Sequence, residues 1–268
     1  DIAAADYHAD CCPAPSLSAS IAHRLVADSP LHAWAAHPRL NPEYEREDRA
    51  TFDLGAAAHA YLLEGVSERV VSIGALDYRT QAARDARDAA RAAGNIPLLT
   101  QQWTAVELMA EAARRQLAAH KDPPIPLTNG TAEQTLIWQE EGLWCRARLD
   151  WLHDDRRTID DYKTTSGSAN PDVWTRGALY TNGADIQAAF YLRGLKVVCG
   201  IEAAWRFVVQ ETFAPYALSV IGLAPSALDL AERKVATAIT AWRHCLEMNT
   251  WPAYPIYTCY AEAPPWEE

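Results

Sequence analysis

The sequence has 268 residues, of which 49% are hydrophobic and ten are tryptophan, so the chain can bury a substantial core. Its formal net charge of −11 argues against a general affinity for nucleic acid, which would require a broadly basic surface. No apolar stretch approaches the length of a membrane span, no secretory signal is visible, and the six cysteines are dispersed, so we expect a cytoplasmic protein with reduced thiols.

The first third of the chain is predicted to be mostly helical. Residues 1–15 lack periodicity and are interpreted as an N-terminal arm or tail, which leaves residues 16–268 as a single domain. A helix with serine caps is expected up to residue 28, and an amphipathic helix over residues 48–65 carries His59. A lone histidine on an apolar helix face is more often a buried, hydrogen-bonded residue than a metal ligand.

A third helix, over residues 79–93, is followed by a fourth at 101–121. The third carries a stripe of arginines at helical spacing: Arg84, Arg87 and Arg91. Such a stripe could bind a DNA backbone, where each arginine would release counterions from phosphates. A solvated face on which these arginines pair with nearby aspartates is an equally good interpretation.

The centre of the chain predicts a β-hairpin. After a strand at 131–140, two runs rich in bulky residues, 143–153 and 158–163, flank a polar turn. With the turn centred between Asp155 and Arg156, Asp150 lies opposite Asp161 and shares a face with Lys163. The turn charges Asp154, Asp155, Arg156 and Arg157, together with Asp160, are interpreted as ordinary surface charges, so Asp160→Asn would be nearly silent.

Asp150, Asp161 and Lys163 predict a metal site. Like charges directly opposite each other destabilise a strand pair and raise a carboxyl pKa, and a divalent cation between them removes the conflict. Carboxylate oxygens suit Mg²⁺, which binds one or two carboxylates together with phosphate oxygens of a substrate. A neighbouring ammonium group could stabilise charge that develops at phosphorus. The pattern therefore indicates phosphodiester hydrolysis.

The rest of the chain completes an α/β protein with one central mixed β-sheet flanked by helices. Loops are expected at 167–174 and 177–183, a helix at 184–198, a hairpin from strands 203–213 and 217–223, and a long helix at 225–249. Gln187 and Tyr191 lie four residues apart on one face of the first of these helices. Their polar groups need partners, which a scissile phosphate, a water network or buried hydrogen bonds would provide.

At these residues the chain resembles the PD-(D/E)xK nucleases in the form of the RecE-like phage and prophage exonucleases (exodeoxyribonuclease VIII type). Asp150 and the run Asp161-Tyr162-Lys163 are similar to the motif that gives this group its name. Three further segments resemble the family: Gly55-x-x-x-His59-x-x-Leu-Leu-Glu64, Gln187-x-x-x-Tyr191, and Gln210-Glu211 followed by Pro215-Tyr216. The resemblance extends from about residue 17 to 266 and implies a restriction-endonuclease-like core.

The resemblance implies a set of site residues. Metal would be held by His59, Asp150, Asp161 and the Tyr162 main-chain carbonyl, with Lys163, Gln187 and Tyr191 completing the catalytic set. Glu133 could reach the metal, as additional acidic residues do in some relatives, whereas Glu64 is more simply a helix-surface charge. Two N-terminal candidates for phosphate contacts are Arg24 and Ser29, for which helix-surface and helix-cap roles are the simpler interpretations.

The activity implied is Mg²⁺-dependent digestion of one strand of linear duplex DNA from its 5′ end, leaving 3′ overhangs for recombination; Mn²⁺ could replace Mg²⁺. The resemblance also implies a bacterial or phage-infected cell, a single-strand annealing partner of the RecT type and a ring-shaped homo-oligomer, whose channel alone would need to be cationic. The wide spacing of Cys245 and Cys259 argues against the iron–sulfur cluster of some other nucleases of this fold.

Three other functions remain open. A structure-specific or restriction-type endonuclease could use the same core. A non-catalytic DNA-binding protein of this fold would not need the intact Asp150, Asp161 and Lys163 set. A hydrolase of a small phosphoester is disfavoured because no motif for a base or sugar pocket is visible.

Overall fold

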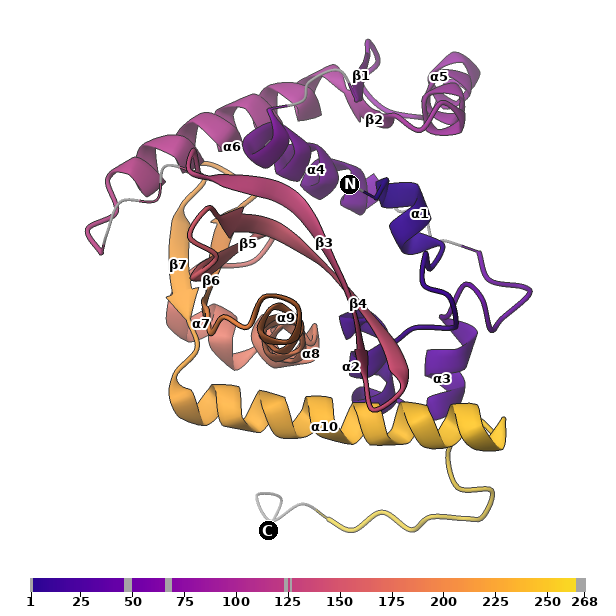
Figure 1. Cartoon of the computed structure of the whole chain (residues 1–268). Helices are drawn as coiled ribbons and strands as arrows, with labels where there is room; N and C mark the ends of the chain where they lie inside the picture. Colours follow the sequence, from indigo (N-terminus) through magenta and orange to yellow (C-terminus); the bar gives the residue numbers. More distant parts are fainter. Residues whose placement is uncertain (1, 46–49, 66–68, 123–124, 126, 264–268) are drawn as a thin grey trace.

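The centre of the computed structural model, which describes residues 2–45, 50–65, 69–122, 125 and 127–263, is a five-stranded sheet (Figure 1). Its strands follow the order β3 (Gly130–Glu140), β4 (Leu143–His153), β5 (Thr158–Thr165), β6 (Ala204–Glu211) and β7 (Leu218–Gly222). β5 and β6 run parallel, whereas the other neighbouring pairs are antiparallel. The α/β fold with a central mixed sheet, predicted from the sequence, is therefore confirmed.

Helices cover both faces of this sheet (Figure 1). One face packs against α4 (Ala50–His59), its π-helical extension η1 (Ala60–Glu64) and α6 (Thr100–Ala118). The opposite face packs against α2 (Ala19–Ala27), α9 (Ala184–Cys199) and α10 (Pro225–Met248). Because both faces are covered, every residue of β4 and β5 is buried or partly buried, and the sheet lies between two hydrophobic clusters.

The connection from β5 to β6 is more helical than the sequence predicted. The expected loops contain α7 (Pro171–Arg176) and α8 (Ala178–Thr181) before α9 begins. Asn170 starts α7 because its side chain accepts a hydrogen bond from the Asp172 N–H at 3.0 Å and Pro171 occupies the first helical position. Both helices are too short to show a helical period in the sequence, so the turn-forming residues around them predicted loops instead.

A small outlying unit completes the fold. Strands β1 (Val70–Ile73) and β2 (Ile96–Leu99) pair in parallel, with α5 (Gln81–Ala92) connecting them. The sequence predicted helices at 79–93 and 101–121 with no strand between them, so β2 was missed. The start of the predicted helix at 48–65 lies outside the described residues before position 50. Among the helices that the structure describes, none is both long and apolar enough to cross a membrane.

The N-terminal segment is not a free tail over its described residues. It forms a short helix, α1 (Ala4–His8), whose Tyr7 is buried and lies over the guanidinium groups of Arg146 and Arg148 on β4. Asp10 is also buried and lies 3.0 Å from Arg146. The sequence did not predict this burial, because the arginine that lies closest to the Asp10 carboxylate comes from β4, far along the chain.

Replacing Asp10 with asparagine is expected to lower stability in a pH-dependent way. Although burial alone would raise the pKa of Asp10, hydrogen bonds from His37 and Ser16 and the charge of Arg146 lower it to about 2. A depressed carboxyl pKa stabilises the fold above the unfolded value of 3.8, and this contribution is lost as the pH falls through about 2. The free energy of unfolding in urea should therefore fall by about 2 kcal/mol at pH 7.

The same comparison at low pH and a control test the Asp10 prediction. At pH 2.5 the difference between the Asp10→Asn variant and the native chain should be much smaller. Asp6→Asn, which changes an exposed aspartate in the same segment, should leave unfolding unchanged at both pH values. A deficit that is equal at pH 7 and pH 2.5 would contradict the role given to the Asp10 charge.

Candidate active site

The hairpin of β4 and β5 brings Asp150 and Asp161 together. Its register is fixed by two cross-strand pairs beside the turn, Trp151 with Asp160 and Leu152 with Ile159. One residue farther along both strands, Asp150 comes opposite Asp161, as the sequence predicts. Asp150 Oδ2 accepts a hydrogen bond from the Tyr162 N–H at 2.9 Å, and Lys163 Nζ lies 2.6 Å from Asp161 Oδ2.

The two carboxylates have different proton affinities. Burial raises the pKa of Asp161 to about 6, and the nearby charge of Asp150 adds to the increase while Lys163 opposes it. Burial would also raise the pKa of Asp150, but His59, Lys163 and the Tyr162 N–H together hold it below its ordinary value. The site therefore holds one firmly ionised carboxylate beside one whose charge is costly, which favours binding of a cation.

His59 lies at the end of α4, where the helix widens into the π-helical turn η1. Gly55, one turn earlier, lets α4 pack close to β5, because a Cβ at this position would lie 3.0 Å from the Thr164 hydroxyl on β5. His59 Nε2 lies 3.2 Å from Asp150 Oδ2. Burial would lower the pKa of His59, but the charges of Asp150 and Glu133 raise it to about 9. In the absence of a metal, the imidazole is therefore protonated at neutral pH.

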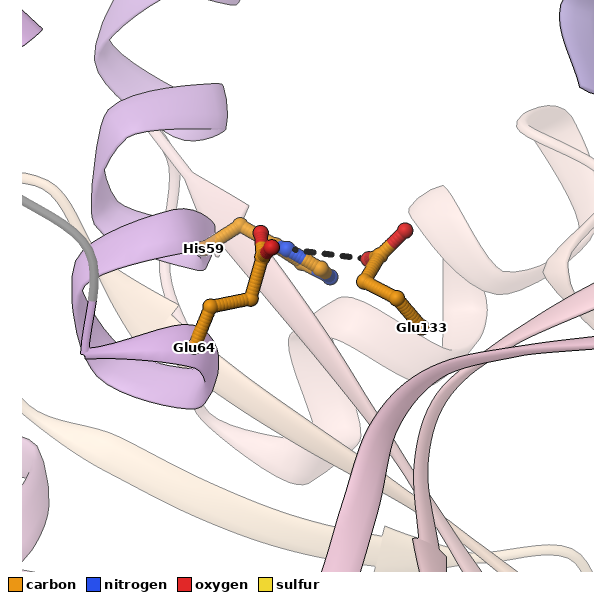
Figure 2. Close-up of side chains that lie close together, drawn as sticks. All are labelled: His59, Glu64 and Glu133. Carbon is orange, nitrogen blue, oxygen red and sulfur yellow. Dashed lines mark ion pairs between the residues drawn. The ribbon is translucent and has the colours of Figure 1, made fainter. Parts of the chain in front are cut away.

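Two glutamates point toward His59 from different elements (Figure 2). Glu133 on β3 places Oε1 3.4 Å from His59 Nδ1, and its other oxygen is ion-paired with Arg148. Glu64 at the end of η1 completes a group whose potential ligand atoms lie within 4.8 Å of one another. The sequence favoured a helix-surface role for Glu64, yet this side chain is only partly exposed and lines the same cleft as His59. The signal that could have located it was its place in the Gly55–Glu64 motif.

The helix α9 supports the carboxylates from the opposite side. Gln187 Nε2 donates a hydrogen bond to Asp161 Oδ1 at 2.8 Å. Tyr191 is buried one turn later, where its hydroxyl faces Tyr7 and the main chain at Arg148, and burial raises its pKa. The geometry thus gives Gln187 direct contact with the site, whereas Tyr191 connects α9 to β4 and the N-terminal helix.

A cleft of about 980 Å³ adjoins the candidate site. His59, Lys163 and Glu133 lie in its wall, and α1 contributes His8 to another part of it. The cleft is also lined by the polar residues Thr164, Ser166, Gln102 and Arg69. A cleft of this size is large enough for several atoms of a phosphodiester backbone.

The remaining candidates for phosphate contacts have local partners. Arg24 lies 3.7 Å from Asp28, and Ser29 caps α3 (Pro30–Ala35) by accepting from the His32 N–H. The arginines of α5 are also paired: Arg84 with main-chain carbonyls of Tyr78 and Arg79, Arg87 with Asp88, and Arg91 with Asp53. These contacts favour the surface, cap and paired-arginine interpretations, so a role in binding phosphate stays a prediction.

Asp160 requires a correction. The four charged residues of the turn are exposed as predicted, but Asp160 is only 2% exposed. Arg206 holds its carboxylate from β6 with nitrogen–oxygen distances of 2.6 and 2.9 Å, and His153 Nε2 lies 2.7 Å away. The surface interpretation was wrong because the cation that pairs with Asp160 comes from a strand 46 residues farther along the chain.

The donor set fits a divalent cation. Asp161 Oδ2 is buried and accepts no hydrogen bond of good geometry from the residues that the structure describes, although Lys163 approaches it. Two carboxylates and an imidazole are the oxygen and nitrogen ligands that Mg²⁺ and Mn²⁺ accept. A cation between Asp150 and Asp161 would relieve the repulsion that raises the pKa of Asp161.

A mixed sheet whose neighbouring strands carry Asp150 and the Asp161-x-Lys163 run defines a fold of the PD-(D/E)xK nuclease class. Residues 19–261 match the family described as "PDDEXK-like domain of unknown function (DUF3799)", and the chain belongs to this family. The family assignment supports a nuclease, whereas a RecE-like specificity stays a prediction.

One solved structure supports the fold. A protein from Eubacterium rectale, described as a proposed exonuclease, is 12% identical, with a TM-score of 0.62 over 96% of both chains. At this identity the likeness concerns the fold alone. The structure of SSO0001, also 12% identical, covers 73% of this chain and 88% of its own with a TM-score of 0.29, which carries no argument. No curated protein matches the sequence.

Proposed function

We propose that the protein is a Mg²⁺-dependent exodeoxyribonuclease that digests one strand of linear duplex DNA from its 5′ end. The observation that supports this function most strongly is the meeting of Asp150, Asp161 and Lys163 on two neighbouring strands, with Lys163 in the wall of the cleft and His59 3.2 Å from Asp150. Two acidic groups, an ammonium group and an imidazole beside an open cleft suit phosphodiester hydrolysis. The resemblance to RecE-type enzymes supplies the polarity and the preference for DNA ends.

The proposed mechanism assigns a task to each side chain. Asp150, Asp161, His59 and the Tyr162 carbonyl would hold the cation, which when bound supplies Lewis-acid stabilisation of charge on the phosphoryl group. Gln187 fixes Asp161 through Oδ1. The ammonium group of Lys163 lies in the cleft wall, where it orients the attacking water and stabilises the negative charge that develops on the phosphoryl oxygens.

The acidic net charge constrains how DNA would bind. With a formal charge of −11, the outer surface repels a polyanion, so attraction must come from the cleft and its bound cation. A ring-shaped homo-oligomer would concentrate cationic groups in a channel and keep the enzyme on one duplex. We propose this assembly, together with a RecT-type partner that binds the 3′ overhang; native mass spectrometry with and without a short duplex tests the assembly.

Circular and linear substrates separate this function from the alternatives. With Mg²⁺, linear duplex DNA labelled at one 5′ end should lose its label as mononucleotides, while covalently closed circular DNA of the same sequence should stay intact. Cleavage of the circle would instead indicate an endonuclease on the same core. Binding of the duplex with no release of nucleotides in Mg²⁺ or Mn²⁺ would indicate a non-catalytic DNA-binding protein.

A further inference from the structure

The two ring nitrogens of His59 face different carboxylates. Nε2 lies 3.2 Å from Asp150 Oδ2, and Nδ1 lies 3.4 Å from Glu133 Oε1 (Figure 2). A neutral imidazole has one N–H and one lone pair, so the partner of one nitrogen decides what the other can bind. If His59 is to donate a lone pair on the Asp150 side, its proton must reside on Nδ1.

Glu133 is built into the sheet at the place where it can hold that proton. On either side of it, Ala132 pairs with Trp151 and Gln134 with Leu149, so Glu133 falls opposite Asp150 across β3 and β4. Its backbone adopts a φ of 58°, an unusual conformation for a non-glycine residue in a strand. Arg148 binds Oε2 and thereby leaves Oε1 directed at the imidazole.

We propose that Glu133 is a positioning residue: it accepts the Nδ1–H of His59 and so directs the Nε2 lone pair toward the ion that Asp150 binds. This inference rests on the proposed function, because it concerns the same metal site. Carboxylates behind metal-binding histidines act in this way in other proteins, and their removal costs roughly 10–100-fold in metal affinity.

The competing arrangement is a second cation between His59, Glu64 and Glu133, whose potential ligand atoms lie within 4.8 Å of one another. One imidazole lone pair cannot serve this ion and also an ion at Asp150. Each glutamate is also paired with an arginine: Glu133 with Arg148, and Glu64 with Arg69 at 3.7 Å. A second ion would have to share both carboxylates with arginines that repel it, so the positioning role needs fewer changes.

Three variants of the full-length chain separate these arrangements. Glu133→Ala removes the acceptor, Glu133→Gln keeps an oxygen acceptor without the charge, and Glu64→Gln alters the other glutamate. Mn²⁺ alone is titrated into each protein by calorimetry at pH 8 in the absence of DNA. The tautomer of His59 is read from the ¹⁵N shifts of the histidine rings in the Mg²⁺-loaded proteins, with the His59 signals assigned by comparison with His59→Gln.

The positioning role predicts one bound Mn²⁺ per chain and a roughly 10–100-fold weaker affinity in Glu133→Ala. Glu133→Gln should retain most of the affinity because its amide oxygen still accepts the Nδ1–H, and Glu64→Gln should bind normally. In the native chain His59 should carry its proton on Nδ1, whereas in Glu133→Ala a fraction of His59 should leave the ion and no longer show this tautomer alone.

Other results would overturn the proposal. Equal losses in Glu133→Gln and Glu133→Ala would mean that only the glutamate charge matters. Two ions in the native chain, with one lost in Glu64→Gln, would establish the second-cation arrangement. Asp161→Asn keeps the two proposals distinct: if it abolishes Mn²⁺ binding while Glu133→Ala binds normally, the nuclease site stands and the positioning role fails. If the native chain binds no Mn²⁺, both the proposed nuclease site and the positioning role of Glu133 are wrong.

Discussion

Replacing Lys163 with alanine is expected to reduce phosphodiester cleavage by roughly 10³-fold, because the group that stabilises developing negative charge in the cleft is lost. The same change should leave divalent cation binding largely intact, because it removes a positive charge that lies 2.6 Å from Asp161. Lys163 also lowers the pKa of Asp161, so in the variant that carboxyl should ionise at higher pH. Nucleotide release from end-labelled duplex DNA and Mn²⁺ titration, both at pH 8, measure the two effects.

A matched control for this variant is Lys196→Ala. Lys196 lies on α9, where its exposed ammonium group is paired with Glu202 at 2.7 Å, and it does not line the cleft. The Lys196 variant should cleave DNA at the native rate. Normal turnover in Lys163→Ala would show that the role given to this lysine is wrong, and loss of both turnover and metal binding would show that it acts by holding Asp161 in place.

The sequence predicted the centre of this site because the relevant geometry is local. A short polar turn fixed the register of β4 and β5, and the two-residue alternation of strands then put Asp161 and Lys163 on one face. The helix that carries Gln187 and Tyr191 was likewise visible from its apolar period. None of these steps required knowledge of how distant segments pack.

The parts that the sequence did not predict depend on contacts between distant segments. Tyr7 and Asp10 are buried because they meet Arg146 on β4, and no pattern within the first fifteen residues contains that information. The orientation of Glu133 depends on a local left-handed backbone and on Arg148, fifteen positions away. Strand alternation alone therefore located the carboxylates at the centre but not the groups that surround them.

Asp160 is the clearest example of a residue whose environment depends on a distant segment, and its replacement has the largest expected effect on stability. Its neighbour Asp161 contacts Gln187 and Lys163, whereas Asp160 is paired with His153 and Arg206. The two adjacent aspartates thus lie on opposite faces with separate partners: Asp161 belongs to the proposed metal site, and Asp160 pairs with Arg206 and so connects β5 to β6. Loss of one partner from a buried ion pair leaves the other partner's charge uncompensated.

Replacing Asp160 with alanine is therefore expected to lower the free energy of unfolding by about 3–5 kcal/mol, because Arg206 would lose its partner in a site that is 19% exposed. Urea denaturation at pH 7 measures this loss, and Asp154→Asn, which changes an exposed aspartate of the same turn, should be silent. At a temperature where the Asp160 variant stays folded, its Mn²⁺ affinity should equal that of the native chain, since Asp160 does not face the cleft. A variant of native stability that fails to bind Mn²⁺ would contradict this division and make Asp160, rather than Asp161, the metal-binding aspartate of the pair.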